Sequence, residues 1–183
     1  MDKKETHWLY ENSSTNKERY LLGEQGTHMI ACIGVNPSTA EPNLLDPTLR
    51  KVKSIATFNG FDGWIMYNVY PQRATDPNDL DVVCNNRIHH KNNKAIRKSI
   101  VALGIKTVWL AYGDLIGKRD FLPLCLYDLY MSLEDLELNW CIINCPTKKG
   151  HPRHPLYQKT ANKIIPFAMP QYINKVVLPK TSH

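Results

Sequence analysis

The sequence lacks any long hydrophobic run. None of its segments approaches the roughly 18 consecutive apolar residues that a membrane-spanning helix requires. The polar start, Met-Asp-Lys-Lys-Glu, also differs from a secretory signal peptide, which carries an apolar core. We therefore predict a cytoplasmic protein that has no membrane partner.

The sequence also lacks the cysteine pattern of a disulfide-bonded protein. The chain has 5 cysteines at irregular spacing, and this odd number, without a signal peptide, predicts reduced thiols rather than a disulfide framework. Cys141 and Cys145 are close in sequence, but no second pair completes the four ligands of a structural zinc site. We therefore expect no metal and no other cofactor.

Several motifs of common enzymes are absent. The sequence contains no Gly-x-Ser-x-Gly elbow, no Walker loop and no Gly-x-Gly-x-x-Gly fingerprint. These absences argue against a serine hydrolase, a P-loop enzyme and a Rossmann dehydrogenase. Acidic residues are also outnumbered, because 23 Lys and Arg face 17 Asp and Glu, which gives a net charge of +6. That charge favours a phosphate-bearing partner, either nucleic acid or a nucleotide.

What the sequence does contain is an alternation of apolar segments and helical patterns. We expect strands at 20–22, 29–34, 63–70, 105–112 and 140–145. We expect helices at 48–59, from 78 or 79 to 103, at 121–131 and at 158–167. Asp46 followed by Pro47 suits the cap and first position of the first of these helices. The alternation implies βαβ units, and so an α/β fold of three α/β/α layers around a mostly parallel central sheet of about four strands. The length predicts a single domain over 1–183, with a polar segment at 1–19 and a tail of undetermined structure at 170–183.

The first candidate for a functional site is the segment 30–40. Its apolar start suits a buried strand, and Gly34 then allows a sharp turn where a side chain would clash. Pro37 fixes its own φ and biases Asn36 toward extended geometry, so the Asn36 side chain should point in a defined direction. Open α/β sheets bind ligands at such strand ends, although an ordinary capped turn has the same composition. The residues that we assign to the site are Gly34, Asn36, Pro37, Ser38 and Thr39.

The second candidate follows the next long strand. Asn68 ends that strand, and its amide offers both a donor and an acceptor, which suits the edge of a base or simply caps the strand. Arg73 can bind a phosphate or pair with Asp76 as a clip inside the loop. Asn68, Arg73 and Asp76 are therefore assigned to ligand binding.

The third candidate is the loop 148–155. It holds 2 histidines, 2 prolines and 3 cations in 8 residues. The prolines restrain the loop while the cations attract an anion, and a solvated basic loop is the alternative interpretation. We assign His151, Arg153 and His154 to the site.

The order of these segments resembles a known family signature. The segments GVNPSTA at 34–40, DPT at 46–48, RATDP at 73–77 and GHPRHPLY at 150–157 resemble an uncharacterised bacterial and phage family. More distantly, the layout is similar to the uracil-DNA glycosylase superfamily. In that superfamily a turn after the first strand positions the attacking water, an Asn recognises the base, and a His loop holds the leaving base.

The glycosylase resemblance implies roles for particular residues. Asn36 falls on the water-positioning residue and Asn68 on the base-recognising Asn, while either His151 or His154 falls on the loop histidine. Ser38 stands where the glycosylases have Gly, which bears on their close approach to the DNA backbone. The resemblance also implies a glycosylase-like fold, and it implies no iron–sulfur cluster, because Cys84 alone aligns with a cluster ligand.

The leading hypothesis is a protein that binds a nucleobase, a nucleotide or nucleic acid and hydrolyses an N-glycosidic bond. The catalytic residues would then be Asn36 and one of His151 and His154, with the base held through a hydrogen bond to the histidine. The alternatives are a non-catalytic nucleic-acid binding module and a metabolic enzyme that acts on a free nucleotide or another phosphate ester. The sequence makes no prediction of the oligomeric state.

Overall fold

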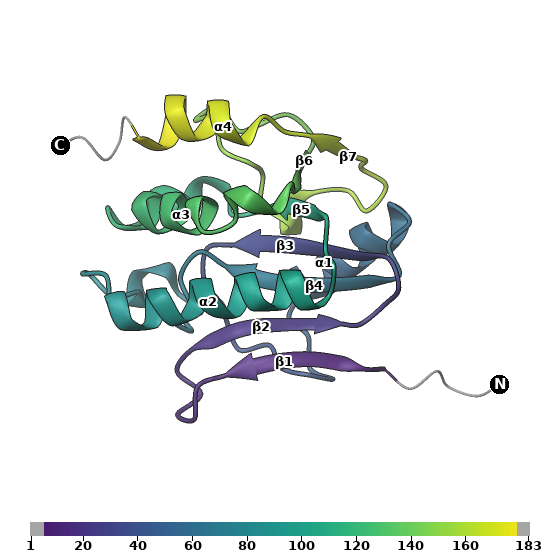
Figure 1. Cartoon of the computed structure of the whole chain (residues 1–183), viewed down its shortest axis with the longest axis horizontal. Helices are drawn as coiled ribbons and strands as arrows, with labels where there is room; N and C mark the ends of the chain where they lie inside the picture. Colours follow the sequence, from purple (N-terminus) through teal and green to yellow (C-terminus); the bar gives the residue numbers. More distant parts are fainter. Residues whose placement is uncertain (1–5, 179–183) are drawn as a thin grey trace.

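The computed structural model describes residues 6–178, so the polar start at 1–5 and the last residues, 179–183, lie outside the described part. Its centre is one seven-stranded sheet in the order β1-β2-β4-β3-β5-β6-β7 (Figure 1). The strands are β1 (Trp8–Asn12), β2 (Arg19–Glu24), β3 (Met29–Gly34), β4 (Gly63–Asn68), β5 (Thr107–Leu110), β6 (Asn139–Ile143) and β7 (Ile164–Pro166).

The sheet is mixed rather than mostly parallel. The strands β4, β3, β5 and β6 run parallel to one another. The strands at the two edges join antiparallel, with β1 on β2, β2 on β4 and β7 on β6. The predicted fold class, a mostly parallel sheet of about four strands in a glycosylase-like arrangement, is therefore wrong.

The error arose at the edges of the sheet. β1 lies in the segment that was predicted only to be polar, and its alternation is weak because four of its five residues are half-buried. β7 lies inside the predicted helix 158–167, where a short apolar run of only 3 residues is compatible with either structure. Pairing with β6 decides the outcome, and an edge strand tolerates Pro166 at its end.

Helices cover both faces of the sheet. α1 (Pro47–Phe58) lies behind the sheet in Figure 1, whereas α2 (Asn86–Ala102) and α3 (Leu122–Met131) lie in front of it. Their apolar residues form two buried clusters, one on each side of the strands. The short helical segments are η1 (Pro77–Asp79), η2 (Gly113–Gly117), η3 (Glu134–Leu136), η4 (Pro155–Tyr157), α4 (Met169–Tyr172) and η5 (Ile173–Val177).

Two helix starts are informative. The predicted cap of α1 is confirmed, because the Asp46 carboxylate accepts a hydrogen bond from the backbone N–H of Leu49 at 2.8 Å and Pro47 is the first helical residue. α2, in contrast, begins at Asn86 instead of residue 78 or 79. The intervening residues form η1 and an irregular connection, and Asn85 is the cap.

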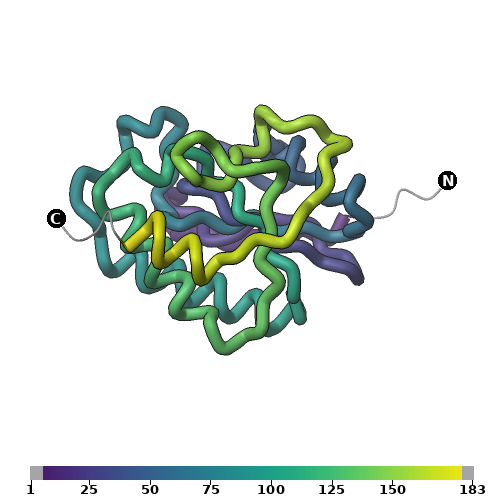
Figure 2. Tube along the Cα trace, turned by 90° about the horizontal axis from the view of Figure 1, so that it is seen from above, coloured from purple at the N-terminus to yellow at the C-terminus, as the bar shows by residue number. Residues whose placement is uncertain are grey.

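The end of the described chain returns to the core. α4 and η5 pack beside α3, and Figure 2 shows this yellow segment lying along the green one. Met169, Tyr172 and Val177 are buried there. Within the described residues, no helix is long and apolar enough to cross a membrane.

Candidate functional site

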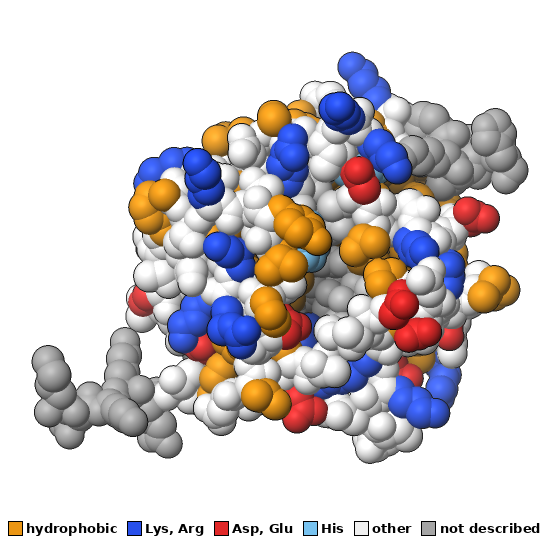
Figure 3. Space-filling model, turned by 180° about the vertical axis from the view of Figure 1, so that it is seen from behind, with side chains coloured by type: hydrophobic (Ala, Val, Ile, Leu, Met, Phe, Trp, Pro, Cys, Tyr) orange, Lys and Arg blue, Asp and Glu red, His pale blue; other side chains and the backbone are white. Residues whose placement is uncertain are grey.

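A pocket of about 270 Å³ opens where β3, β4 and β5 end. Figure 3 shows the molecule from the side of α1, and this face is hollowed near its centre, with hydrophobic side chains beside the hollow. The polar and glycine residues that line the pocket are Arg19, Gly34, Asn36, Ser38, Asp46, Thr48, Asn68, Thr75, Tyr112 and His154. The pocket thus draws on all three segments that the sequence singled out.

Asn68 is a polar side chain that is almost completely buried at the pocket. It is 1% exposed, and neither its amide nitrogen nor its amide oxygen forms a hydrogen bond within residues 6–178. The strand end that carries it is held in place, because Asn92 of α2 donates a hydrogen bond to the Asn68 carbonyl at 2.8 Å. A buried polar group without a partner is costly, and both polar atoms of this amide remain available for hydrogen bonds.

Gly34 makes room for Asn68. The two residues are register partners on β3 and β4. A Cβ atom at position 34 would lie 3.0 Å from the Asn68 Oδ1 atom and 2.6 Å from the Met66 Cε atom. A side chain at position 34 would therefore displace the ends of the Met66 and Asn68 side chains.

The Asn36 side chain is oriented so that its amide oxygen has no partner among the described residues. Its side-chain nitrogen donates to the carbonyl oxygen of Ala74 at 2.8 Å and to that of Pro37 at 3.1 Å. These two acceptors fix the orientation of the amide, so its oxygen is the atom that remains for a ligand or a water. That oxygen has no hydrogen-bond partner in the described part of the chain. The expectation that the Asn36 side chain is held in a defined direction is confirmed.

The structure places His154, and not His151, on the pocket. The Nδ1 atom of His154 accepts a hydrogen bond from the backbone N–H of Leu156 at 3.3 Å. Burial lowers the pKa of His154, and the nearby Asp46 carboxylate opposes that shift. In the neutral ring the proton then resides on Nε2, which can donate to a ligand.

The position of His154 depends on the end of β5. Gly113 adopts φ +62°, and a Cβ atom there would lie 3.1 Å from the His154 Cβ atom. The Gly113 N–H also donates to the carbonyl of Pro152 at 2.9 Å. Asp114 accepts a hydrogen bond from Thr147 at 2.6 Å, which fastens the start of the same loop.

His151 has a different environment. It is 2% exposed, and its Nδ1 atom lies 2.8 Å from the hydroxyl oxygen of Tyr172 in α4. This contact joins the basic loop to the C-terminal segment. His151 therefore lies in the core, outside the pocket lining.

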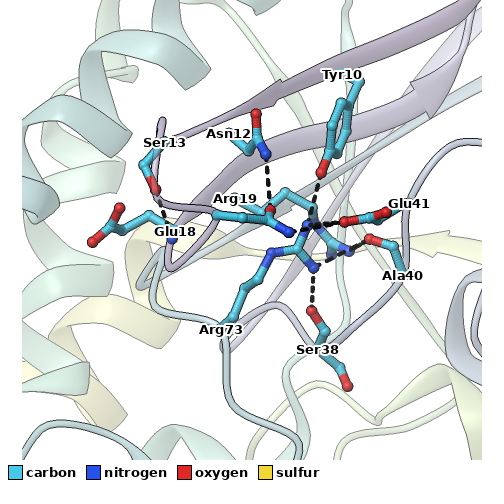
Figure 4. Close-up of polar contacts among 10 residues, drawn as sticks. Tyr10, Asn12, Ser13, Glu18, Arg19, Ser38, Ala40, Glu41 and Arg73 are labelled. Carbon is cyan, nitrogen blue, oxygen red and sulfur yellow. Dashed lines mark hydrogen bonds and ion pairs between the residues drawn. The ribbon is translucent and has the colours of Figure 1, made fainter.

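Arg73 also lies outside the pocket lining. Its guanidinium donates to the carbonyls of Ser38 and Ala40 and to the Tyr10 hydroxyl, and Glu41 lies 3.7 Å away (Figure 4). It does not pair with Asp76. In this geometry Arg73 holds the turn that carries Asn36, rather than pointing toward a ligand.

Arg19, a residue that the sequence analysis missed, meets the same turn. It is 2% exposed, and it donates to the Ala40 carbonyl at 3.0 Å (Figure 4). Burial, with a smaller contribution from the neighbouring Arg73, lowers the pKa of Arg19 to about 10. Its Nε atom is buried without a hydrogen-bond partner in the described residues.

The remaining predicted residues divide between the mouth of the pocket and its surroundings. Ser38 lies at the mouth, where its hydroxyl is 3.1 Å from the Thr75 hydroxyl. Asp76 caps η1 through Asn78. Arg153 lines an adjoining cavity of about 550 Å³, which shares His154 with the first pocket. Two more of the predicted residues, Pro37 and Thr39, are not part of the lining.

The pocket also contains charges that the sequence analysis did not assign to it. Asp46 was predicted as a helix cap only, and Arg19 as part of a polar segment. Both reach the pocket because β2 and the start of α1 pack against the 36–40 turn, which local patterns do not reveal. Across residues 6–178, no group of three or more His, Cys, Asp and Glu side chains is arranged to hold a metal ion.

Comparison with known proteins identifies a family. Residues 19–156 match the family described as "Protein of unknown function (DUF1643)". No curated protein and no solved structure matches the chain. The match covers well over half of the chain and confirms the expected membership of an uncharacterised family.

Proposed function

Since the chain belongs to the DUF1643 family of proteins of unknown function, whose description names no activity, we propose a function from the site itself. The protein binds a nucleobase-bearing substrate and hydrolyses the N-glycosidic bond between base and sugar. The observation that carries this proposal is Asn68, whose buried amide has both of its polar atoms unpaired among the described residues.

The Asn68 amide is suited to one kind of ligand edge. An amide donates through nitrogen and accepts through oxygen, so it matches an adjacent acceptor and donor such as those on a nucleobase. The pocket volume of about 270 Å³ lies just below the range of drug-sized sites and suits a ligand of nucleobase or nucleoside size. The resemblance of the flanking segments to the uracil-DNA glycosylases agrees with this assignment.

Two further groups on the pocket suit bond cleavage. As the glycosidic bond breaks, negative charge moves onto the base and the sugar carbon becomes cationic. A neutral His154 can donate from Nε2 to the departing base, which stabilises that charge. The Asn36 oxygen can orient the water that attacks the sugar carbon. In this assignment His154 is the loop histidine and His151 a structural residue.

The test is a search for released base. The purified protein is incubated with single- and double-stranded oligonucleotides that carry uracil, hypoxanthine, a thymine mismatch or hydroxymethyluracil, and with the corresponding nucleosides and nucleotides. We expect free base, together with abasic sites in the oligonucleotides. His154→Ala should lower the rate roughly 10²- to 10³-fold, as loss of a donor to developing charge does in other enzymes.

The matched control is His90→Ala, which removes an exposed histidine on α2 and should leave the rate unchanged. Asn68→Leu keeps the approximate side-chain size but removes both polar atoms, so it should weaken binding of the free base. If the unaltered protein releases no base from any of these substrates, the hydrolase proposal fails.

A second candidate is a metabolic enzyme that acts on a free nucleotide. The cavity that adjoins the pocket is lined by Arg153 and Tyr157, which suits a phosphate next to a ring. The Arg153 guanidinium already donates to the Cys145 carbonyl at 2.8 Å through Nε, so only its other N–H groups could bind a phosphate. Mononucleotide binding that is at least tenfold tighter than binding of oligonucleotides or nucleosides would favour this candidate.

A further inference from the structure

Asp46 is the only carboxylate among the residues that line the pocket. It is half-buried, and it shares the pocket with Asn36, Asn68 and His154. Its position at the start of α1 gives it an evident structural role as a helix cap. That role uses only one of its two carboxylate oxygens.

The geometry of the cap leaves the second oxygen available. Oδ1 accepts the hydrogen bond from the Leu49 N–H at 2.8 Å, which fixes the rotamer of the side chain. Oδ2 forms no hydrogen bond and no ion pair within residues 6–178. A carboxylate that is held in one orientation, with one oxygen unused, is preorganised to accept a proton.

The charges around Asp46 suit the same role. The cationic Arg19 and the imidazole of His154 both interact electrostatically with this carboxylate. Arg19 is buried and forms no ion pair with a carboxylate in the described residues, and Asp46 is the acidic residue that lines the pocket with it.

The proposed hydrolysis needs a base that Asn36 cannot supply. An amide oxygen orients a water, but it does not take a proton from that water at neutral pH. We propose that Asp46 is the general base of the reaction, an inference that rests on the proposed function. It adds a catalytic residue to a site in which only orienting and charge-stabilising groups were assigned.

The water oxygen forms a bond to the anomeric carbon of the sugar, and the C–N bond breaks with its electron pair moving to the base nitrogen. Asp46 accepts a proton from the water, while the His154 Nε2–H donates a hydrogen bond to the departing base. The proton on Asp46 then passes to the base anion, so the products are the free sugar hydroxyl and the neutral base.

The substitution Asp46→Asn separates catalysis from capping. Asn caps a helix about as well as Asp, so the fold and the binding of free base should be retained. Asn cannot accept the proton, and kcat should therefore fall roughly 10²- to 10⁴-fold, the usual contribution of a general base. The measurements are kcat on the substrate that the unaltered protein hydrolyses, binding of the free base, and the thermal unfolding midpoint.

Asp46→Ser gives a second variant that also caps the helix but leaves space beside it. Adding sodium formate to this variant should restore part of the lost rate, because formate can occupy the position of the missing carboxylate. A cap that had only a structural role would show no such rescue. If Asp46→Asn fails to fold, the formate response of Asp46→Ser decides the question.

Three results would overturn the assignment. Retention of kcat by a folded Asp46→Asn protein would remove Asp46 from catalysis and leave the hydrolase proposal intact. A fall in kcat/KM caused entirely by weaker binding would make Asp46 a substrate-binding residue instead. Absence of hydrolysis by the unaltered protein would refute the hydrolase proposal itself, and the role of Asp46 as its base with it.

Discussion

Gly34 illustrates how single residues shape the pocket. The Asn68 amide and the Met66 methyl group lie in the space that a Cβ atom at position 34 would need. Gly34→Ala should displace both side chains. We expect the free energy of unfolding to fall by roughly 1–3 kcal/mol, as overpacking of a filled core does. Binding of free nucleobases should weaken at the same time. Urea denaturation and a binding titration measure the two effects.

Gly117→Ala is the matched control for this change. A Cβ atom at position 117 meets no atom within 4 Å. Its effect on stability should stay within about 0.5 kcal/mol, as is usual for an unhindered surface position. Equal effects of the two substitutions would contradict the close approach that we describe at Gly34.

The sequence predicted part of the site at the level of residues. Asn36, Asn68 and one loop histidine follow buried strands, and parallel strand ends meet at one edge, so their convergence could be expected. Two registers remained for the histidine, because the choice depends on packing: His151 contacts Tyr172, which is distant in sequence. No local pattern marked Arg19 or Asp46 as a pocket residue, since their place in the pocket follows from contacts with the 36–40 turn.

At the level of elements, the 36–40 turn is held from outside. Arg73 of the following loop and Arg19 of β2 both donate to the Ala40 carbonyl, and Tyr10 of β1 accepts from Arg73. The turn therefore keeps its shape through the N-terminal hairpin. This arrangement gives Arg73 a positioning role that a phosphate-binding residue would not have.

Arg73→Lys tests that role while keeping the charge. Lysine lacks the planar fork that reaches three acceptors at once. We expect the free energy of unfolding to fall by roughly 1.5–3 kcal/mol, the usual contribution of a hydrogen bond to a charged group. Binding of free base should also weaken, because the turn that carries Asn36 loosens. Thermal unfolding and equilibrium dialysis report these changes.

Tyr10→Phe provides a graded comparison. It removes one of the contacts of Arg73, and its cost should be only about 0.5–1.5 kcal/mol. If Arg73→Lys changes neither the stability nor the affinity for free base, the turn does not depend on the guanidinium.

The central elements could be predicted from the sequence, whereas the edge strands could not. The central strands were predicted because buried parallel strands are continuous apolar runs. The cap of α1 was predicted because Asp followed by Pro is a strong local signal. The edges were missed because β1 and β7 are short, and their pairing partners, rather than their own residues, decide their conformation.

At the level of the whole molecule, the buried His89 and the half-buried His154 should make stability depend on pH. Burial lowers the pKa of His89, with Asp128 opposing the shift, and burial lowers the pKa of His154. Both folded values lie below the ordinary value of about 6.5, so the unfolded chain takes up protons first. The contribution is fully present above about pH 6.5 and declines as the pH falls toward the folded values.

Urea denaturation between pH 7 and pH 5 measures this dependence. His89→Gln should flatten the decline in the free energy of unfolding over that range. His90→Gln, which changes the exposed neighbour on α2, is the matched control. A decline that stays equally steep in the His89 variant would assign the pH dependence to other groups.

The family match does not coincide with the folding unit. Residues 19–156 exclude β1, β7 and α4. However, β1 pairs with β2, β7 pairs with β6, and Met169 and Tyr172 of α4 are buried. A protein trimmed to residues 19–156 should therefore show no cooperative thermal transition, whereas residues 6–178 should retain one. Circular dichroism on both proteins checks this expectation.

The pocket is assembled from residues between Arg19 and Leu156, which belong to seven separate stretches of the chain. It therefore exists only in the fully folded molecule, and any compound that occupies it must favour the folded over the unfolded state. A ligand at 100 times its dissociation constant adds about 2.7 kcal/mol to the free energy of unfolding. A rise in the melting temperature thus reports occupancy without any assumption about chemistry, so a melting screen of nucleobases, nucleosides and nucleotides can identify the natural ligand before a reaction is known.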